Sequence, residues 1–167
     1  MFQINDYVVY GKTGVCQIDA IKKHKFIGDA EAEYNIMHPV EDERVTVMTP
    51  VANPKVFMRS LTTREKIDRL IKNMPTFACG WITDDRQRRV AFKTALHSGI
   101  CEEWIKMIRG AYLKKGEGTG RDKRLHPADE EIVKSAERLL YEEFSVSLQI
   151  PLGEVEPYIL SHLPQAV

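Results

Sequence analysis

The sequence predicts an α+β fold in which a small antiparallel β unit precedes an all-α domain. Two observations lead to this fold class. The first 50 residues contain short β-branched and aromatic runs separated by turn residues, which is typical of strands linked by hairpins. From Thr62 onward, apolar residues recur at intervals of three and four, which is typical of amphipathic helices. The predicted division is a β domain with a terminal helix at 1–74, a linker at 75–82 and a helical domain at 83–167.

Residues 7–50 contain the predicted strands. The run 7–10 ends at Gly11 and Gly14, which can adopt the positive φ angles of a tight turn. Further strands are expected at 15–21, 34–40 and 44–51, with turns at 28–29 and 41–43 between them. In the first of these, Val15, Gln17 and Asp19 are predicted to share the solvent-facing side.

Four or five strands in so short a stretch match the size of a Tudor-like or SH3-like barrel. Such a barrel is filled by its own side chains and has no ligand cavity. We therefore expect it to bind another protein through an exposed edge or rim, or alternatively to serve only as a scaffold.

The segment 51–60 is predicted to be irregular because Pro50 and Pro54 interrupt it. Thr62 and Glu65 have the spacing of a capping box, which predicts a helix start. This helix is expected to end near Asn73, ahead of Pro75, and to bury three apolar side chains, Ile67, Leu70 and Ile71.

The second half of the sequence predicts four more helices. Thr83 is expected to cap the first, with Asp84 and Asp85 in its first turn and Ser98-Gly99 at its end. Its predicted buried residues are Val90, Ala91, Phe92, Ala95 and Leu96. The next helix, at 100–115, is expected to bury Trp104, Ile105, Ile108, Ala111 and Tyr112.

Three glycines within Gly116–Gly120 predict a mobile break after that helix. Pro127 is placed to open the longest helix, at about 128–148, because proline is favoured in a first helical turn. Its predicted inner face is Ile132, Val133, Ala136, Leu139, Leu140 and Phe144. A last helix is expected at 154–163, with Pro157 in its first turn.

Charge is segregated along the chain although its formal net value is zero. Residues 81–124 hold 11 Lys and Arg against 6 Asp and Glu, an excess of five cations. Residues 1–80 hold 11 against 10, and residues 125–167 hold 2 against 8. A polyanion senses the local field within about 10 Å, so the segment 81–124 is a candidate nucleic-acid surface.

The predicted DNA-binding residues lie in this segment. Arg86, Arg89 and Lys93 share one face of a helix over about 10 Å, with Arg88 to its side, a span that bridges successive phosphates of one strand. The alternative is an ordinary solvated helix face. Further candidate cations follow: Lys106, Arg109, Lys114, Lys115, Arg121, Lys123 and Arg124.

The two tryptophans have different predicted roles. Trp81 follows Gly80 in a loop beside the basic helix, where an indole can stack on a base or wedge into the minor groove. Alternatively, it packs at the domain junction. Trp104 occupies a core position of its helix, so we expect it to be structural.

Catalytic and metal-binding patterns do not emerge from the sequence. The three cysteines and five histidines are dispersed, without the spacing of a disulfide framework or a metal site. Nucleotide-binding and nucleophile-elbow motifs are absent, and the glycines of 116–120 do not follow a strand. We expect a non-enzymatic protein without a cofactor or metal. With no signal peptide and no apolar run of about 20 residues, we expect a cytoplasmic protein without membrane association.

The succession of motifs resembles a known family. Asp6–Tyr10 with Gly14-Val15 comes first, then Val45–Pro50 leading to Met58-Arg59, and then Trp81 followed by Arg89 and Ser98-Gly99. This order is similar to that of the CarD-like transcription regulators, a bacterial family whose N-terminal domain also occurs in the transcription-repair coupling factor.

The resemblance implies that the Tudor-like domain docks on the RNA polymerase β subunit. It also implies that the helical domain touches promoter double-stranded DNA at the upstream edge of the bubble, with Trp81 against the minor groove, and stabilises the open complex. The implied polymerase contacts are Lys23, His24, Lys25, Val45, Thr46, Val47, Met48, Thr49 and Pro50. Members often have a basic residue where this chain has Met48 and Thr49.

We expect a monomer that associates with the nucleoid through the polymerase. The alternative function is an interaction adaptor whose helical domain binds protein or RNA without contacting a promoter.

Overall fold

The computed structural model of the 167-residue chain describes residues 1–52, 55–118 and 124–165. They fall into two compact units, Met1–Leu61 (unit 1) and Thr62–Val167 (unit 2).

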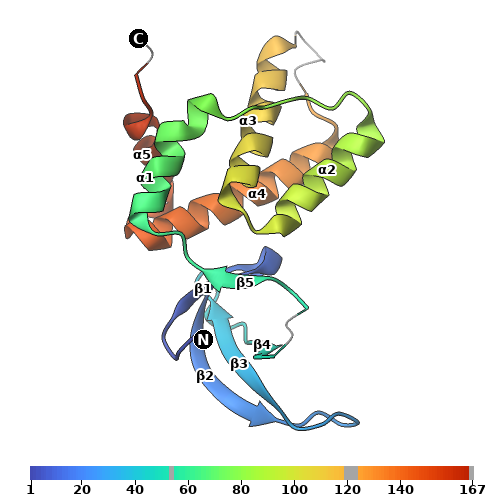
Figure 1. The fold of residues 1–167 in the computed structure, drawn as a ribbon, viewed down its shortest axis with the longest axis vertical. Coiled ribbons are helices and arrows are strands. Elements are labelled where there is room, and N and C mark those ends of the chain that lie inside the picture. The colour runs from blue at the N-terminus through green and yellow to red at the C-terminus, as the bar shows by residue number, and fades with distance from the viewer. Residues whose placement is uncertain (53–54, 119–123, 166–167) are drawn as a thin grey trace. The chain divides into compact units, whose positions relative to one another are not determined.

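Unit 1 is built on a five-stranded antiparallel sheet over its described residues (Figure 1). The strands are β1 (Tyr7–Tyr10), β2 (Gly14–His24), β3 (Ala32–Pro39), β4 (Val47–Pro50) and β5 (Met58–Ser60). Their order in the sheet is β4-β3-β2-β1-β5. The predicted antiparallel β unit is confirmed. Among the described residues β4 pairs with β3 alone and β5 with β1 alone, so closure into a Tudor-like or SH3-like barrel stays a prediction.

The core of unit 1 forms where alternate residues of neighbouring strands meet. Val8, Cys16, Ile18 and Met37 are fully buried, and Tyr10, Ile21, Val47 and Met58 pack around them.

The structure corrects the prediction that Val15 faces solvent. It is fully buried, opposite the equally buried Val9 of β1, and Val40 N–H donates to its carbonyl (3.0 Å). Asp19 is exposed at a break in the register between Ile18 and Ala20.

The turn between β1 and β2 has the predicted backbone geometry. Gly11 and Gly14 adopt φ angles of 47° and 94° on either side of a short 3₁₀ turn. An added Cβ at Gly11 would clash with Val56 Cγ1, so this position requires glycine for its lack of a side chain as well as for its φ angle.

Two strand predictions for the end of unit 1 were wrong. The segment 51–60, predicted to be irregular, contains β5, because Met58 pairs with Tyr10 and Gly11 N–H donates to Phe57 O (3.0 Å). This pairing comes from a distant strand, and local composition does not reveal it. Conversely, β4 begins only at Val47, since Arg44 is held in the preceding turn by Asp42 (Nε to Oδ1, 2.9 Å).

Unit 2 is helical over its described residues (Figure 1). Its helices are α1 (Arg64–Asn73), α2 (Asp85–Ser98), α3 (Cys101–Glu117), α4 (Pro127–Leu148) and α5 (Val155–His162). Gly99, with φ of 71°, ends α2 as predicted, and Pro127 opens α4. Gly116 lies within α3 rather than in the predicted break, while residues 119 and 120 lie outside the described residues.

The two predicted N-caps are each one residue too early. Thr63 caps α1 by accepting from Lys66 N–H (3.4 Å), whereas the Thr62 hydroxyl lies 3.5 Å from Cys101 Sγ and the Thr62 N–H donates to the buried Glu143 carboxylate (2.7 Å). Asp84 caps α2 by accepting from Gln87 N–H (2.8 Å), whereas the Thr83 carbonyl accepts from Arg88 (3.3 Å).

The core of unit 2 confirms most of the predicted apolar faces. Every predicted inner residue of α4 is buried, as are Trp104, Ile105, Ile108 and Ala111 of α3. Two predicted core residues are exposed instead: Val90, at 61%, lies on the solvent side of α2, and Tyr112, at 56%, donates to Glu137 Oε1 (2.6 Å). Of the predicted inner residues of α2 only Leu96 is buried, and Ala91, Phe92 and Ala95 are half-buried, as is Leu70 of α1.

Helix α1 belongs to unit 2, whereas the predicted boundary lay between Met74 and Gly80. Its buried Ile67 and Ile71 form one apolar face, and Tyr158 of α5 donates to Asp68 Oδ1 (2.7 Å). Arg64 donates to the Leu148 carbonyl at the end of α4 (2.8 Å). The helix therefore joins the helical core, and the division falls at residue 61.

In the part of the chain that the structure describes, no helix is long and apolar enough to span a bilayer. Over the same residues, His, Cys, Asp and Glu side chains do not gather in threes as metal ligands would.

Candidate functional site

Helix α3 supports the segment 77–84, which contains Trp81 and leads into α2. Arg109 Nη1 donates to Met74 O (2.5 Å) and to Phe77 O (3.1 Å). A Cβ added at Gly110 would lie 3.8 Å from Gly80 O, so this segment passes in ordinary contact over α3.

Lys106 contributes to the same support, with Nζ 5.9 Å from the Phe77 ring centroid and 2.9 Å from Glu102 Oε1. Lys106 and Arg109, predicted to bind DNA, are thus engaged in holding this segment.

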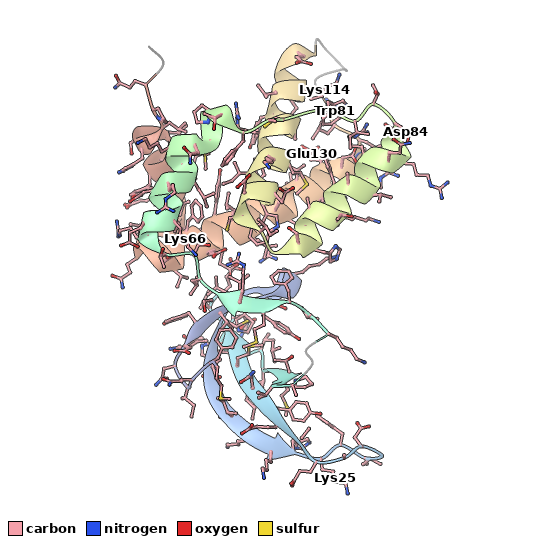
Figure 2. The ribbon with its side chains drawn as sticks, in the orientation of Figure 1. Lys25, Lys66, Trp81, Asp84, Lys114 and Glu130 are labelled. Atoms are coloured by element: carbon pink, nitrogen blue, oxygen red, sulfur yellow. The ribbon has the colours of Figure 1, made fainter. Side chains whose placement is uncertain are left out.

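The Trp81 ring packs within the helical unit and is half-buried. Phe92 of α2 lies edge-on to it, with ring centroids 6.0 Å apart. Arg88 Cζ lies 4.6 Å from the centroid of the indole, and Lys114 Nζ lies 5.9 Å from it. Figure 2 shows Trp81 and Lys114 next to each other in unit 2. Cations over an indole face are attracted by its quadrupole, so both groups help to fix the ring.

Arg88 differs from its prediction because its side chain is buried, with only 5% exposed. Its Nε and Nη2 donate to Asp129 Oδ2 (2.9 and 2.7 Å), and Nη2 also donates to Asp85 Oδ1 (2.7 Å). Nη1 donates to the carbonyls of Ile82 (2.9 Å) and Thr83 (3.3 Å). A guanidinium with these partners is not placed to contact a phosphate.

The charges around Arg88 stabilise one another. Burial alone lowers the pKa of Arg88, but the hydrogen bonds to Asp129 and Asp85 outweigh it, and the pKa is raised. The hydrogen bond from Arg88 also lowers the pKa of Asp85. Asp84 accepts from the backbone as the α2 cap. Both carboxylates beside Trp81 are therefore engaged.

Among the remaining predicted cations, three are exposed and Arg89 is half-buried. Arg86 and Lys93 are exposed on the solvent side of α2, and Arg89, which lies between them in sequence, is 32% exposed. Arg124 is exposed ahead of α4. Arg89 Nη2 lies 3.5 Å from His126 Nδ1, and Nε lies 3.8 Å from Asp129 Oδ1, too far for a hydrogen bond. We call Arg86, Arg89 and Lys93 the basic face of α2.

Two groups of predicted DNA contacts lie outside this face. Lys115 is paired with Glu130 (3.1 Å), which lowers the pKa of Glu130. Arg121 and Lys123 lie outside the described residues.

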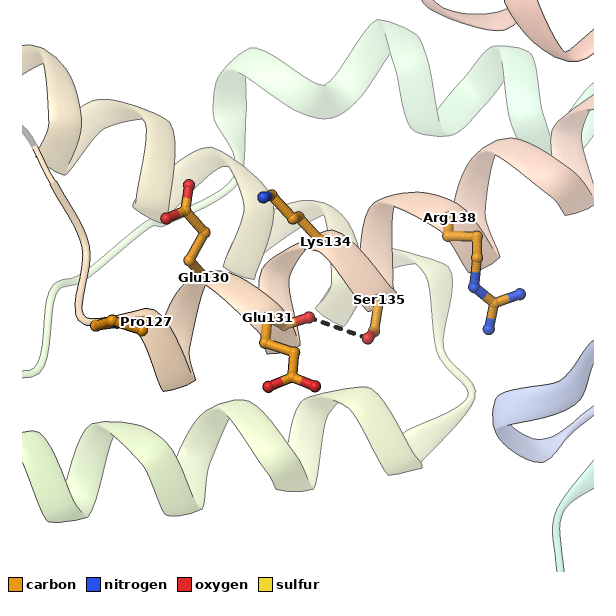
Figure 3. A pocket seen from close by; sticks show the side chains of 6 residues that line it. All are labelled: Pro127, Glu130, Glu131, Lys134, Ser135 and Arg138. Carbon is orange, nitrogen blue, oxygen red and sulfur yellow. Dashed lines mark hydrogen bonds between the residues drawn. The ribbon is translucent and has the colours of Figure 1, made fainter.

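A shallow hollow on α4 has a different character (Figure 3). Ser135 Oγ donates to the Glu131 carbonyl there (3.0 Å). Its lining side chains come from Pro127, Glu130, Glu131, Lys134, Ser135 and Arg138. Two carboxylates balance two cations, so the hollow does not extend the basic face.

Strand β4 has an outer edge in unit 1. Val51 N–H donates to Glu33 O (2.9 Å), and β4 pairs in register with β3, Met48 lying opposite Ile36. Because hydrogen-bonded and non-hydrogen-bonded pairs alternate in antiparallel ladders, the Met48 N–H and C=O point away from β3. The Met48 side chain is also exposed, at 38%, whereas Thr49 is buried and Val47 packs on the core. Met48 therefore presents its N–H, its C=O and an exposed side chain on this edge.

The tip of the β2–β3 hairpin carries the other predicted contacts (Lys25 in Figure 2). Lys23, His24 and Lys25 are exposed. The His24 ring lies 4.3 Å from Phe26, and Phe26 lies 5.4 Å from Tyr34, between centroids.

Tyr34 pairs with Lys22 on β2 and with Pro50 on β4, so the sheet brings both groups of predicted residues together. Sequence reasoning missed Phe26 and Tyr34. The sequence did contain a signal for them, because Phe26 is an aromatic residue in an otherwise charged hairpin.

A family model described as the CarD-like/TRCF RID domain matches residues 2–62. Unit 1 is therefore similar to the CarD-like/TRCF RID domain. The match ends one residue beyond the end of the compact unit at Leu61, and it includes all five strands. Among curated proteins, no relative matches the chain.

The RID domain is an RNA polymerase β-interacting domain, which gives the chain a transcription-related, polymerase-binding role. The resemblance to CarD-like regulators is thus confirmed over this domain. All predicted polymerase contacts lie within it, whereas Trp81 and the basic face lie in unit 2, beyond the match.

Proposed function

We propose that this protein is a non-enzymatic transcription regulator that works in the cytoplasm, at the nucleoid. The RID domain binds the RNA polymerase β subunit, and unit 2 holds promoter DNA at the upstream edge of the bubble, which stabilises the open complex. The RID match is the observation that carries the proposal, because RID domains interact with the RNA polymerase β subunit. The exposed cations Arg86 and Lys93 on the basic face of α2 support the DNA contact.

Polymerase docking proceeds through the outer edge of β4 in this proposal. An exposed strand edge can accept an added strand from another protein, with backbone hydrogen bonds supplying affinity. Met48 presents its N–H, C=O and side chain on that edge. The aromatic group at the hairpin tip, His24, Phe26 and Tyr34, adjoins Pro50 at the end of the same edge.

Met48→Pro is expected to abolish binding to the isolated β subunit while leaving the RID domain folded. Proline removes the outward N–H, but Met48 does not use this N–H in the β3–β4 ladder, and edge strands tolerate proline. Binding of the full chain to immobilised β subunit measures the effect, and circular dichroism checks the fold.

Met48→Ala is the matched control. It keeps the N–H and loses only the side chain, so it should bind more weakly than wild type but more tightly than Met48→Pro. Equal binding by Met48→Pro and wild type would show that β4 is not the docking edge.

The DNA contact acts by shifting a pre-existing equilibrium. A protein that binds the melted promoter better than the closed one shifts the equilibrium between open and closed promoter. The size of the shift is set by the difference between the two binding free energies. A difference of about 1.4 kcal/mol changes the ratio of open to closed promoter tenfold. Tethering by the RID domain supplies the local concentration that four exposed cations, Arg86, Arg89, Lys93 and Arg124, do not supply alone.

The double variant Arg86→Gln, Lys93→Gln is expected to lower duplex affinity and its salt dependence. If the four exposed cations each neutralise one phosphate, log affinity falls with log salt at a slope of about −3.6. Loss of two contacts reduces that slope by about 1.8. Fluorescence anisotropy of a labelled promoter duplex, titrated with the full chain at several salt concentrations, gives both slopes.

The matched control is Lys134→Gln, Arg138→Gln, which removes two exposed cations from the hollow on α4. This control should retain the wild-type slope. A flat salt response of the wild-type chain would contradict the DNA role and favour an adaptor that binds protein or RNA.

A further inference from the structure

Two adjacent arginines of α2 have opposite environments. Arg88 is 5% exposed and Arg89 is 32% exposed, and both lie near the fully buried carboxylate of Asp129. Asp129 Oδ2 accepts twice from Arg88, whereas Oδ1 lies 3.8 Å from Arg89 Nε. Neither Oδ1 nor that Nε has a hydrogen-bond partner among the described residues. Asp129 therefore fixes the first arginine by two hydrogen bonds, whereas it holds the second only at ion-pair distance, and Arg89 Nη2 lies 3.5 Å from His126 Nδ1.

We infer that Arg88, oriented by Asp129, is a positioning residue for Trp81, and that Arg89 is a direct phosphate contact. The importance of this division for transcription rests on the proposed function, but the positioning itself does not. It is a property of unit 2 without DNA.

The geometry of Arg88 suits this role. It makes five hydrogen bonds, which match the five N–H donors of a guanidinium. Two of them end on the carbonyls of Ile82 and Thr83, the residues directly after Trp81. The guanidinium also lies 4.6 Å from the indole centroid. Arg88 thus fixes both the backbone that follows Trp81 and one face of its ring.

Lysine cannot reproduce this arrangement. Its ammonium group keeps the charge beside Asp129, but it is a point donor without the planar fork that reaches several acceptors and stacks on an aromatic ring. Arg88→Lys should therefore keep the charge of the cluster and release the Trp81 segment. Arg89→Lys is the matched control, because it makes the same chemical change one residue away.

Acrylamide quenching of tryptophan emission tests the positioning in the full chain. Trp104 is fully buried, so the quenchable emission comes from Trp81, and a Trp81→Phe variant identifies it. Arg88→Lys is expected to increase the quenching constant and shift the emission to the red, and Arg89→Lys is expected to change neither. Unchanged emission in Arg88→Lys would overturn the inference and leave the proposed function standing.

Asp129→Asn is the second variant, since it keeps the size of the side chain and one oxygen acceptor. It should alter Trp81 emission in the same direction as Arg88→Lys. Loss of helical circular dichroism in both variants would also overturn the inference, because the pair would then maintain the whole unit.

Binding to a duplex with a preformed bubble separates the two arginines functionally. Arg89→Gln should reduce the salt slope by about 0.9, the loss of one phosphate contact. Arg88→Lys should leave the salt slope unchanged and lower the affinity about as much as Trp81→Ala does. Combined with Trp81→Ala, it should lower the affinity no further. Additive effects would overturn action through Trp81. If Trp81→Ala itself changes nothing on DNA while its emission responds to Arg88→Lys, the proposed role of Trp81 fails and the positioning stands.

Discussion

Asp129→Ala is expected to lower the free energy of unfolding of unit 2 by about 3–5 kcal/mol. The reason is that Arg88 would keep its buried charge and lose the carboxylate that accepts two of its hydrogen bonds. Urea denaturation followed by tryptophan emission measures this loss. Both tryptophans, Trp81 and Trp104, lie in unit 2, so the signal reports on that unit alone.

Glu130→Ala is the matched control, one residue further along α4. Its partner Lys115 is about one-third exposed, and ion pairs of this kind contribute about 0–1 kcal/mol. The loss in the free energy of unfolding should thus be several-fold larger for Asp129→Ala than for Glu130→Ala. A cost for Asp129→Ala no greater than that for Glu130→Ala would mean that Arg88 reaches water or another acceptor when its partner is removed.

Trp104→Ala is expected to destabilise unit 2 by about 3–5 kcal/mol, the usual range for truncating a buried aromatic side chain. Trp104 is fully buried, and its Nε1 donates to the Leu96 carbonyl (3.2 Å), so the substitution leaves a cavity and an unpaired carbonyl. Urea denaturation followed by far-UV circular dichroism suits this variant, because its main fluorophore is removed.

Trp81→Ala provides the comparison within the same unit. Trp81→Ala should lower the free energy of unfolding clearly less than Trp104→Ala does. The Trp81 ring is half-buried, so less of its surface is removed from water in the folded state. Equal losses of stability for the two variants would identify Trp81 as a structural residue and would contradict its proposed contact with DNA.

Local periodicity predicted the helices of unit 2 and most of the inner faces of α3 and α4, because each amphipathic stripe is a property of a short stretch. The errors occur where distant residues decide the outcome. Thr62 does not cap α1, and its N–H and hydroxyl contact distant residues instead: Glu143, 81 residues further on, and Cys101. β5 exists because β1 pairs with it, although its own sequence follows a proline-rich segment.

The candidate site shows the same limit. Charge counting located the basic segment but could not distinguish Arg88 from Arg89, because the distinction depends on Asp129, 41 residues beyond Arg88. Likewise, Arg109 has the sequence signature of a surface cation, yet its guanidinium holds the backbone at Met74 and Phe77. Only the exposed members of the segment are now expected to contact phosphates.

Pro50 has a consequence for how an added strand can extend along β4. It lies opposite Tyr34, a non-hydrogen-bonded pair, so its backbone faces outward like that of Met48, but proline has no N–H to donate. The ladder with an incoming chain must therefore stop at Pro50 after only a few bonds. A short ladder favours a reversible contact, and the same interruption discourages edge-to-edge aggregation of the protein with itself.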